Sequence, residues 1–423
     1  MGPYTHMLTN TILKFVNNKP RFSKPEKVFE VEELQGLYVK LKGVSTRVEK
    51  AYCHTRHTAS IYKLSHELLR VLHSRPRIRM IEEACANHLE VDMRSAVSTV
   101  RGTAENQVWL RAKYQGRKVV LKTTTKIETM LRYVIEEVIH EIIMRQSPSY
   151  VPALKFIAFA QTADGERDRL VLCSEQLERK SVNAWICSLH SLHPRANINI
   201  KLWKMLRHVC ICLKNLQKFA HFTHRDCHSN NVYYDENCNP DHVKFIDFDW
   251  SSIIYGGHTL SVPRHLFDTA RPSYAKNRSV DLCIFMRTIG PTLRTPLSLK
   301  KKVTFTRKDM TSMNKWNSFE ERSELFFEHI WKPIMARYER ESENTLKARA
   351  ATSKEAMQLL KMNIGPKGEF SHKCGLVYLS KQNAKSVNEF DYRMGYFEWP
   401  SMTPDNILTF LDKQRQNMFP VRH

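Results

Sequence analysis

The chain has 423 residues, of which 42% are hydrophobic and 10% aromatic, so it can bury a full core and is not a wholly disordered protein. Its net charge of +23 favours contact with polyanions such as acidic protein surfaces, nucleic acid or phosphates. No apolar stretch is long enough for a transmembrane segment. The 10 cysteines follow no repeating spacing, which favours a reducing compartment, cytoplasmic or nuclear, over a disulfide framework.

Residues 1–92 are predicted to form a mainly helical extension, because the run at 61–74 places apolar residues at helical spacing. Four side chains in this region are of types that bind zinc: Cys53, His57, Cys85 and His88. Their spacing matches no strong zinc template, so we favour buried thiols and surface imidazoles.

From about residue 96 the pattern changes to short β-like runs at 95–100, 106–114 and 117–123. The sequence YQGRK between the last two indicates a tight turn. A long helix is predicted at 128–146, and two more strand-like runs follow at 153–160 and 169–177. The predicted order over 96–177 is β-β-β-α-β-β.

The chain after about residue 181 is predicted to be mostly helical. Helices are expected at 200–220, 280–289, 319–338 and 403–411, and two short strands are expected in the runs NVYYD and HVKFIDF. A small β-rich part followed by a larger helical part indicates an α+β fold.

The stretch HRDCHSNNVYYD, followed by FIDFDW, carries the chemistry. Asp247 ends an apolar strand, where a carboxylate is costly without a partner such as a divalent cation. Asn231 offers a second oxygen ligand for that cation. Asp226 lies five residues before Asn231 and can accept a proton from an attacking hydroxyl. These are the side chains that phosphoryl transfer needs.

The spacing His224-Arg225-Asp226, four residues, then Asn231 resembles the H-R-D-x-x-x-x-N catalytic loop of protein kinases, and Asp247 stands where that family has D-F-G. The resemblance covers roughly residues 96–290. It implies a bilobal fold with ATP and Mg²⁺ as cofactors, catalytic roles for Asp226, Asn231, Asp247 and Lys122, and a metal site at Asn231 and Asp247.

The resemblance also implies nucleotide contacts elsewhere in the chain. Lys122 matches the lysine of V-A-I-K, and Glu141 on the following helix is its predicted partner, with Glu136 and Glu137 as rivals. The run at 171–178 resembles the hinge between the lobes. The remaining residues that we assign to nucleotide binding are Gly102, Glu175 and His228. Asp281 resembles the aspartate that anchors the catalytic loop.

The chain departs from the family pattern at four places. Its glycine-rich loop keeps only Gly102, Asp249 replaces the glycine of D-F-G, His228 replaces a usual lysine, and no A-P-E follows. This pattern resembles divergent kinases of large DNA viruses or Crinkler-type effectors more than housekeeping kinases. Because residues two apart on an extended segment share a face only while the strand continues, we expect Asp249 to point away from Asp247.

The sequence predicts a helical extension at 1–92, a kinase N-lobe at 93–177, a C-lobe at 178–412 and a tail at 413–423. The leading function is a kinase that phosphorylates Ser or Thr hydroxyls of proteins. A small-molecule kinase of the aminoglycoside or choline type and a catalytically inactive scaffold remain alternatives. The basic surface could also bind acidic partners or nucleic acid.

Overall fold

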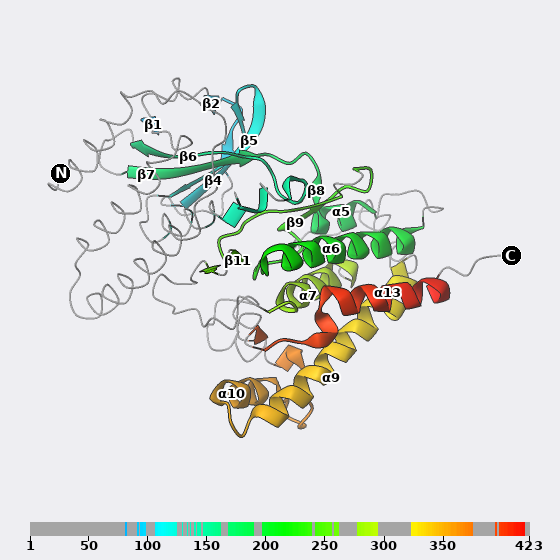
Figure 1. Ribbon diagram of the computed structural model, residues 1–423. Coiled ribbons are helices and arrows are strands. Elements are labelled where there is room, and N and C mark those ends of the chain that lie inside the picture. Colours follow the sequence, from blue (N-terminus) through cyan, green and yellow to red (C-terminus); the bar gives the residue numbers. More distant parts are fainter. Residues whose placement is uncertain are drawn as a thin grey trace, which may run out of the picture. The chain divides into compact units, whose positions relative to one another are not determined.

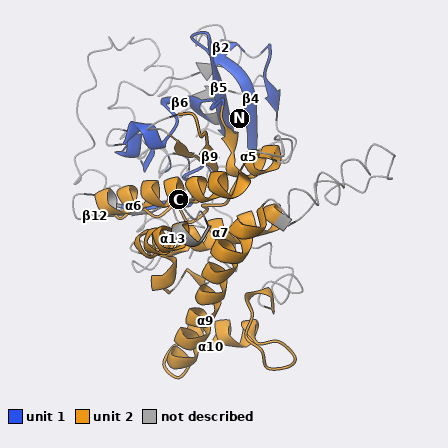
Figure 2. Cartoon of the chain, turned by 90° about the vertical axis from the view of Figure 1, so that its right-hand side faces the viewer, with its two compact units in different colours: residues 1–178, 247–271 blue, residues 179–246, 272–423 orange. Residues whose placement is uncertain are grey.

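The computed structural model describes residues 81–82, 91–92, 94–98, 106–124, 129, 133, 136, 139–140, 142–144, 147–161, 168–189, 197–238, 242–255, 258–261, 277–294, 323–374, 394–395 and 397–418. The chain divides into two compact units (Figure 2). The first comprises residues 1–178 and 247–271, and the second comprises residues 179–246 and 272–423. The chain therefore enters the second unit, returns to the first at Asp247 and leaves it again.

A seven-stranded sheet is the main element of the described part of the first unit (Figure 1). The strands lie in the order β1 (Ile81–Glu82), β6 (Leu154–Gln161), β7 (Asp168–Glu175), β5 (Arg117–Thr124), β4 (Asn106–Tyr114) and β2 (Val91–Asp92), and β3 (Val97–Ser98) pairs with β4. β1 is parallel to β6, and the other neighbours are antiparallel. Gln115 and Gly116, with φ of 50° and 74°, form the predicted tight turn between β4 and β5.

The side chains of β5 alternate between the two faces of the sheet, so its core residues lie on the face opposite Lys122. Val119 and Leu121 are buried in a cluster with side chains of neighbouring strands: Ala112, Tyr114, Val171 and Cys173. Because successive side chains of a strand point to opposite faces, Lys122 lies on the other face of the sheet. There its ammonium group lies 5.7 Å from the centre of the Tyr133 ring.

The segment after β5 is helical at residues 129, 133, 136, 139–140 and 142–144. Tyr133, Glu136, His140 and Ile143 are buried, and their spacing of three and four residues places them on one helical face. The His140 imidazole is 2.7 Å from the Pro152 carbonyl oxygen, which satisfies a buried polar group of this face.

In its described residues, the second unit is mainly helical (Figure 1). Its α-helices are α5 (Val182–Leu189), α6 (Ile198–Ala220), α7 (Val280–Arg294), α9 (Lys332–Arg349), α10 (Lys354–Asn363) and α13 (Pro404–Met418). The π-helical turn η5 (Phe327–Trp331) precedes α9, and the 3₁₀ turn η6 (Pro400–Met402) precedes α13. A small antiparallel sheet has the order β10 (Val243–Phe245), β9 (Val232–Tyr234) and β8 (Lys180–Ser181).

Helix α6 leads to residues 224–231, the sequence that resembles a kinase catalytic loop. The Asn197 side chain caps its N-terminus by accepting the Ile200 N–H at 3.0 Å. Its inner face is apolar and buried at helical spacing, with Val209, Leu213 and Leu216 fully covered. The helix ends at His221, whose φ of 45° stops the α-helical path three residues before His224.

A buried polar network fixes the start of α7. The Asn277 side chain donates to the carbonyl oxygens of Gly395 and Phe397 at 2.7 and 2.9 Å. Its Oδ1 accepts the hydroxyl of Ser279 at 2.8 Å, and the Ser279 hydroxyl oxygen accepts the Trp399 N–H, also at 2.8 Å. The segment before α13 therefore holds the helix that carries Asp281.

The structure confirms the strand runs predicted between 96 and 177 and the helices predicted at 200–220, 280–289 and 403–411. The helix predicted at 319–338 continues to Arg349 and contains a π-helical turn. The helical prediction for 1–92 is wrong at 81–82 and 91–92, which are strands, and the four candidate zinc ligands lie outside the described residues. Within the described chain, no helix is long and apolar enough to cross a membrane.

Candidate functional site

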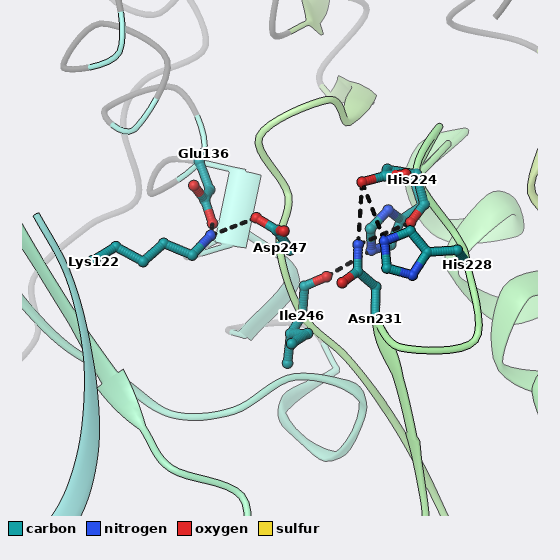
Figure 3. A network of polar contacts seen from close by, with 8 residues as sticks. Lys122, Glu136, His224, His228, Asn231, Ile246 and Asp247 are labelled. Atoms are coloured by element: carbon teal, nitrogen blue, oxygen red, sulfur yellow. Dashed lines mark hydrogen bonds and ion pairs between the residues drawn. The ribbon is translucent and has the colours of Figure 1, made fainter. Parts of the chain in front are cut away.

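A network of three charged side chains lies within the first unit (Figure 3). The ammonium nitrogen of Lys122, on β5, is 2.7 Å from Oε1 of Glu136 and 2.5 Å from Oδ1 of Asp247. Glu136 comes from the helical segment after β5, and Asp247 is the first residue of the chain's return to this unit. The network thus joins residues that lie up to 125 positions apart in the sequence.

The two carboxylates keep Lys122 charged. Burial opposes the charged form of the lysine, but the negative charges of Asp247 and Glu136 outweigh it and hold the pKa of Lys122 well above its usual value. The side chain of Glu136 is only 2% exposed, against 34% for Asp247. Glu136 therefore depends on Lys122 for its charge balance, whereas water contributes to the solvation of Asp247.

The prediction that Glu141 is the partner of Lys122 is wrong, because Glu136 makes this ion pair. Glu141 itself lies outside the described residues. The error is one of helical phase. The buried face of the helix includes the polar residues Glu136 and His140. The prediction placed the buried face from apolar residues alone, and it therefore turned Glu141 instead of Glu136 toward the lysine.

Asp249 also departs from expectation. Its carboxylate and that of Asp247 offer oxygen atoms within 4.8 Å of each other, so the prediction that Asp249 points away is wrong. The turn that follows explains this geometry, since the Ser251 N–H donates to the Phe248 carbonyl at 3.0 Å and curls the chain. Asp247 itself has a φ of 68°, in the left-handed region that residues other than glycine rarely adopt.

Asp281 anchors the catalytic-loop sequence in the second unit. Its Oδ2 accepts the His224 N–H at 2.9 Å, and its Oδ1 accepts the Arg225 N–H at 2.8 Å. Burial raises the pKa of Asp281 to about 6, and these two N–H groups act in the opposite direction. Arg225 has a φ of 64°, so the anchor holds the backbone in a conformation that costs energy.

Within the anchored loop, His228 and Asn231 lie side by side (Figure 3), and both approach Asp226. The Asn231 amide nitrogen donates to the Asp226 carbonyl oxygen at 3.0 Å and to its Oδ2 at 3.3 Å. The His228 Nε2 lies 3.7 Å from the same Oδ2. Since the amide nitrogen of Asn231 faces Asp226, the amide oxygen faces the other way and can serve as a metal ligand.

The residue before Asp247 is tied to this loop. The Ile246 N–H donates to the Asn231 carbonyl at 3.0 Å, and the Ile246 carbonyl oxygen lies 2.9 Å from Nε2 of His224. Ile246 is the last residue of this part of the second unit, and Asp247 follows it covalently. His224 therefore has a structural role in this loop.

The other predicted nucleotide contacts stay predictions. Gly102 lies outside the described residues. Glu175 ends β7 and forms two hydrogen bonds with Ala153. Its N–H donates to the Ala153 carbonyl at 2.8 Å, and its carboxylate accepts the Ala153 N–H at 3.0 Å. Sequence reasoning missed Thr288, whose hydroxyl oxygen accepts the Ser229 N–H at 3.0 Å and steadies the loop. No local motif marks such a contact.

No family model matches the chain, and no curated protein matches it. Among solved structures, the chain is similar to the crystal structure of a BubR1 kinase domain, with 14% identity and a TM-score of 0.37, over 74% of this chain and 97% of the other. A similarity at this TM-score supports no argument about function. The function must therefore be inferred from the residues described above.

Proposed function

We propose that this chain is an ATP- and Mg²⁺-dependent phosphotransferase that phosphorylates Ser or Thr hydroxyls of proteins. The observation that carries the proposal is the ion-pair network of Lys122, Glu136 and Asp247. In protein kinases, a strand lysine paired with a helical glutamate binds the nucleotide phosphates. The sequence motifs had assigned Lys122 to this role and Asp247 to the metal site.

The catalytic loop supplies the second set of roles. The hydroxyl oxygen of the substrate forms a bond to the γ-phosphorus, the bond to the bridging oxygen of ADP breaks, and Asp226 accepts the hydroxyl proton. Asn231 holds the backbone and the carboxylate of Asp226 through its amide nitrogen. Lys122 binds the α- and β-phosphates, for which its stable positive charge is suited.

The metal ligands we propose are Asn231 and Asp247. An amide oxygen and a carboxylate suit Mg²⁺, which prefers one or two protein oxygens together with phosphate oxygens and water. A bound Mg²⁺ would neutralise negative charge on the phosphate oxygens. Asp249 replaces the glycine of D-F-G, and its proximity to Asp247 favours an added carboxylate on the metal side of this segment.

Arg225 favours a protein substrate over a small molecule. Kinases of the aminoglycoside type usually have glycine at this position, whereas an arginine beside the catalytic aspartate can pair with a phosphate on the activation segment. The candidates for that phosphate between 248 and 280 are Ser251, Ser252, Thr259, Ser261 and Thr269. Ser251 and Ser252 are buried, Thr259 and Ser261 lie in a strand, and Thr269 lies outside the described residues.

The test is transfer of labelled γ-phosphate from ATP with Mg²⁺. The purified chain is incubated alone, with a mixed Ser/Thr peptide library, and with aminoglycosides and choline. We expect label on peptides or on the chain itself, and loss of at least about 100-fold in Asp247→Asn. Asp412→Asn is the matched control, because Asp412 is 60% exposed and lies 3.7 Å from Arg207 on the surface.

Two results would contradict the proposal. Transfer only to the small molecules would replace the protein substrate with a small one. If the wild-type chain is folded by circular dichroism and transfers phosphate to no acceptor, the scaffold alternative is favoured.

A further inference from the structure

His228 has a hydrogen bond that determines its tautomer. The Asn230 N–H donates to Nδ1 of His228 at 3.2 Å, so Nδ1 acts as the acceptor. In a neutral imidazole with Nδ1 accepting, the proton is on Nε2. Nε2 is the nitrogen that lies 3.7 Å from Oδ2 of Asp226. The ring therefore presents an N–H donor to the carboxylate that the proposed function uses as a base.

The contact is longer than a hydrogen bond, and catalytic hydrogen bonds are often long before substrate binds. Asn231 donates to the same oxygen at 3.3 Å from its amide nitrogen. The Asn231 amide therefore bonds this oxygen of Asp226, and Nε2 of His228 lies near the same oxygen as a second possible donor. The loop backbone holds the ring in place, because the His228 N–H donates to the Asp226 carbonyl at 2.8 Å.

We infer that His228 is a positioning residue that orients the Asp226 carboxylate through Nε2–H while Asn230 holds its Nδ1. The inference rests on the proposed function and gives His228 a role other than the nucleotide contact expected from the sequence. A lysine, the usual residue at this position in protein kinases, has one nitrogen and no acceptor. It cannot accept from Asn230 and donate to Asp226 at once.

Three variants separate the two roles. His228→Gln keeps a donor near the Nε2 position, His228→Asn keeps an acceptor near the Nδ1 position, and His228→Lys supplies a cation for phosphate. We expect His228→Asn to lower kcat by about 10- to 100-fold with little change in KM for ATP, since orientation of a general base acts on the chemical step. His228→Gln should retain activity within about 5-fold of wild type, and His228→Lys should not restore it.

A lysine variant with wild-type kcat and a lower KM for ATP would overturn the inference and make position 228 a phosphate contact. Equal losses in the Gln and Asn variants of an active enzyme would also overturn it. If the wild type transfers phosphate to no acceptor, the proposed function is wrong, and the role of His228 in that reaction is lost with it.

The tautomer has its own test, which needs no activity. In protein labelled with ¹⁵N-histidine, the ring signals that disappear in His228→Gln belong to His228. We expect these signals to show a neutral ring with the proton on Nε2 at pH 7.5. A proton on Nδ1, or a charged imidazolium at this pH, would contradict the geometry and overturn the inference.

Discussion

The two groups of candidate residues are held in place by different forces. In the first unit, Lys122 is held by the charges of Glu136 and Asp247, which come from separate segments of the chain. In the second unit, the backbone of the catalytic loop is held by Asp281, which accepts two N–H groups and is fully buried. The first group is held by opposite side-chain charges, whereas in the second group the backbone is held by hydrogen bonds to the single residue Asp281.

Under the proposed function, this difference has a consequence for catalysis. The charge network would respond to bound phosphates and a cation, because Lys122 would exchange Asp247 for a phosphate oxygen. A backbone anchored by short hydrogen bonds keeps its shape through the reaction, which an oriented base requires. We therefore expect changes in the first group to act through charge balance and changes in the second to act through backbone order.

The largest expected effect is that of Lys122→Met on stability. The change leaves the Glu136 carboxylate, 2% exposed, without its cation, and the loss in free energy of unfolding should be about 3–5 kcal/mol. The double variant Lys122→Met with Glu136→Leu should recover most of that loss, since no buried charge remains. Urea unfolding of the three proteins measures both values, and neither variant should transfer phosphate.

If the double variant is as unstable as Lys122→Met, lost packing rather than charge explains the effect, and the distinction between the two groups is weaker than we infer.

Replacing the anchor Asp281 with alanine should have the next largest effect. Asp281→Ala leaves the buried His224 N–H and the part-buried Arg225 N–H without an acceptor. The buried group should cost about 1–3 kcal/mol in free energy of unfolding, and the part-buried group should cost less, because water can reach it. Asp281→Asn keeps an acceptor oxygen for one of them and should cost roughly half as much. Urea unfolding measures both costs, with the surface variant Asp405→Asn as the matched control, expected to lie within about 0.5 kcal/mol of wild type.

A loss below about 1 kcal/mol in Asp281→Ala would show that water replaces the carboxylate and that the loop is less firmly anchored than its hydrogen bonds indicate.

A smaller effect, on activity, separates the two candidate glutamates. Glu136→Gln removes the charge that holds Lys122 but keeps the shape of the side chain, so kcat/KM should fall by about 10- to 100-fold with a rise in KM for ATP. Glu141→Gln is the matched variant and should stay within about 3-fold of wild type. Steady-state kinetics with varied ATP gives both values. The opposite ranking would restore the pairing predicted from the sequence.

The sequence was sufficient for residues whose role shows in a short motif. Asp226, Asn231 and Asp247 were singled out from a short motif, and the structure shows that Asn231 donates to Asp226. Their roles as base and metal ligands stay predictions. The strands around Lys122 were predicted from β-like runs and turn residues, because hairpins depend on local sequence.

Features that depend on distant partners were not predicted. The choice between Glu136 and Glu141 required knowledge of which polar side chains are buried, and Glu136 is buried because Lys122 lies opposite it. The bonds from Asn277 to Gly395 and Phe397 join segments about 120 residues apart. The hairpin of β11 (Ser252–Tyr255) and β12 (His258–Ser261) was missed because its strands are short and carry no clear alternation.

Acidification gives the smallest expected effect. The His208 and His242 rings stack with centroids 4.0 Å apart in the second unit. Burial is the main cause that lowers the pKa of His208 to about 4, and the neighbouring Arg207 and Lys204 act in the same direction. The unfolded chain binds a proton at His208 near pH 6.5, whereas the folded chain does so only near pH 4. His208 therefore contributes stability above pH 6.5 that is lost as the pH falls toward 4.

Asp281 acts in the opposite direction in the same range, because its folded pKa of about 6 is raised above the unfolded value, so its contribution to stability increases as the pH falls from 6 to 4. The two contributions partly cancel in the wild type, and a variant is needed to separate them.

We expect His208→Asn to lose less unfolding free energy than wild type between pH 7.5 and pH 5, whatever its stability at pH 7.5. Lys122, with its pKa raised well above 10.5, does not titrate in this range. Urea unfolding at the two pH values measures the difference, and an equal loss in both proteins would show that His208 does not resist protonation in the folded state.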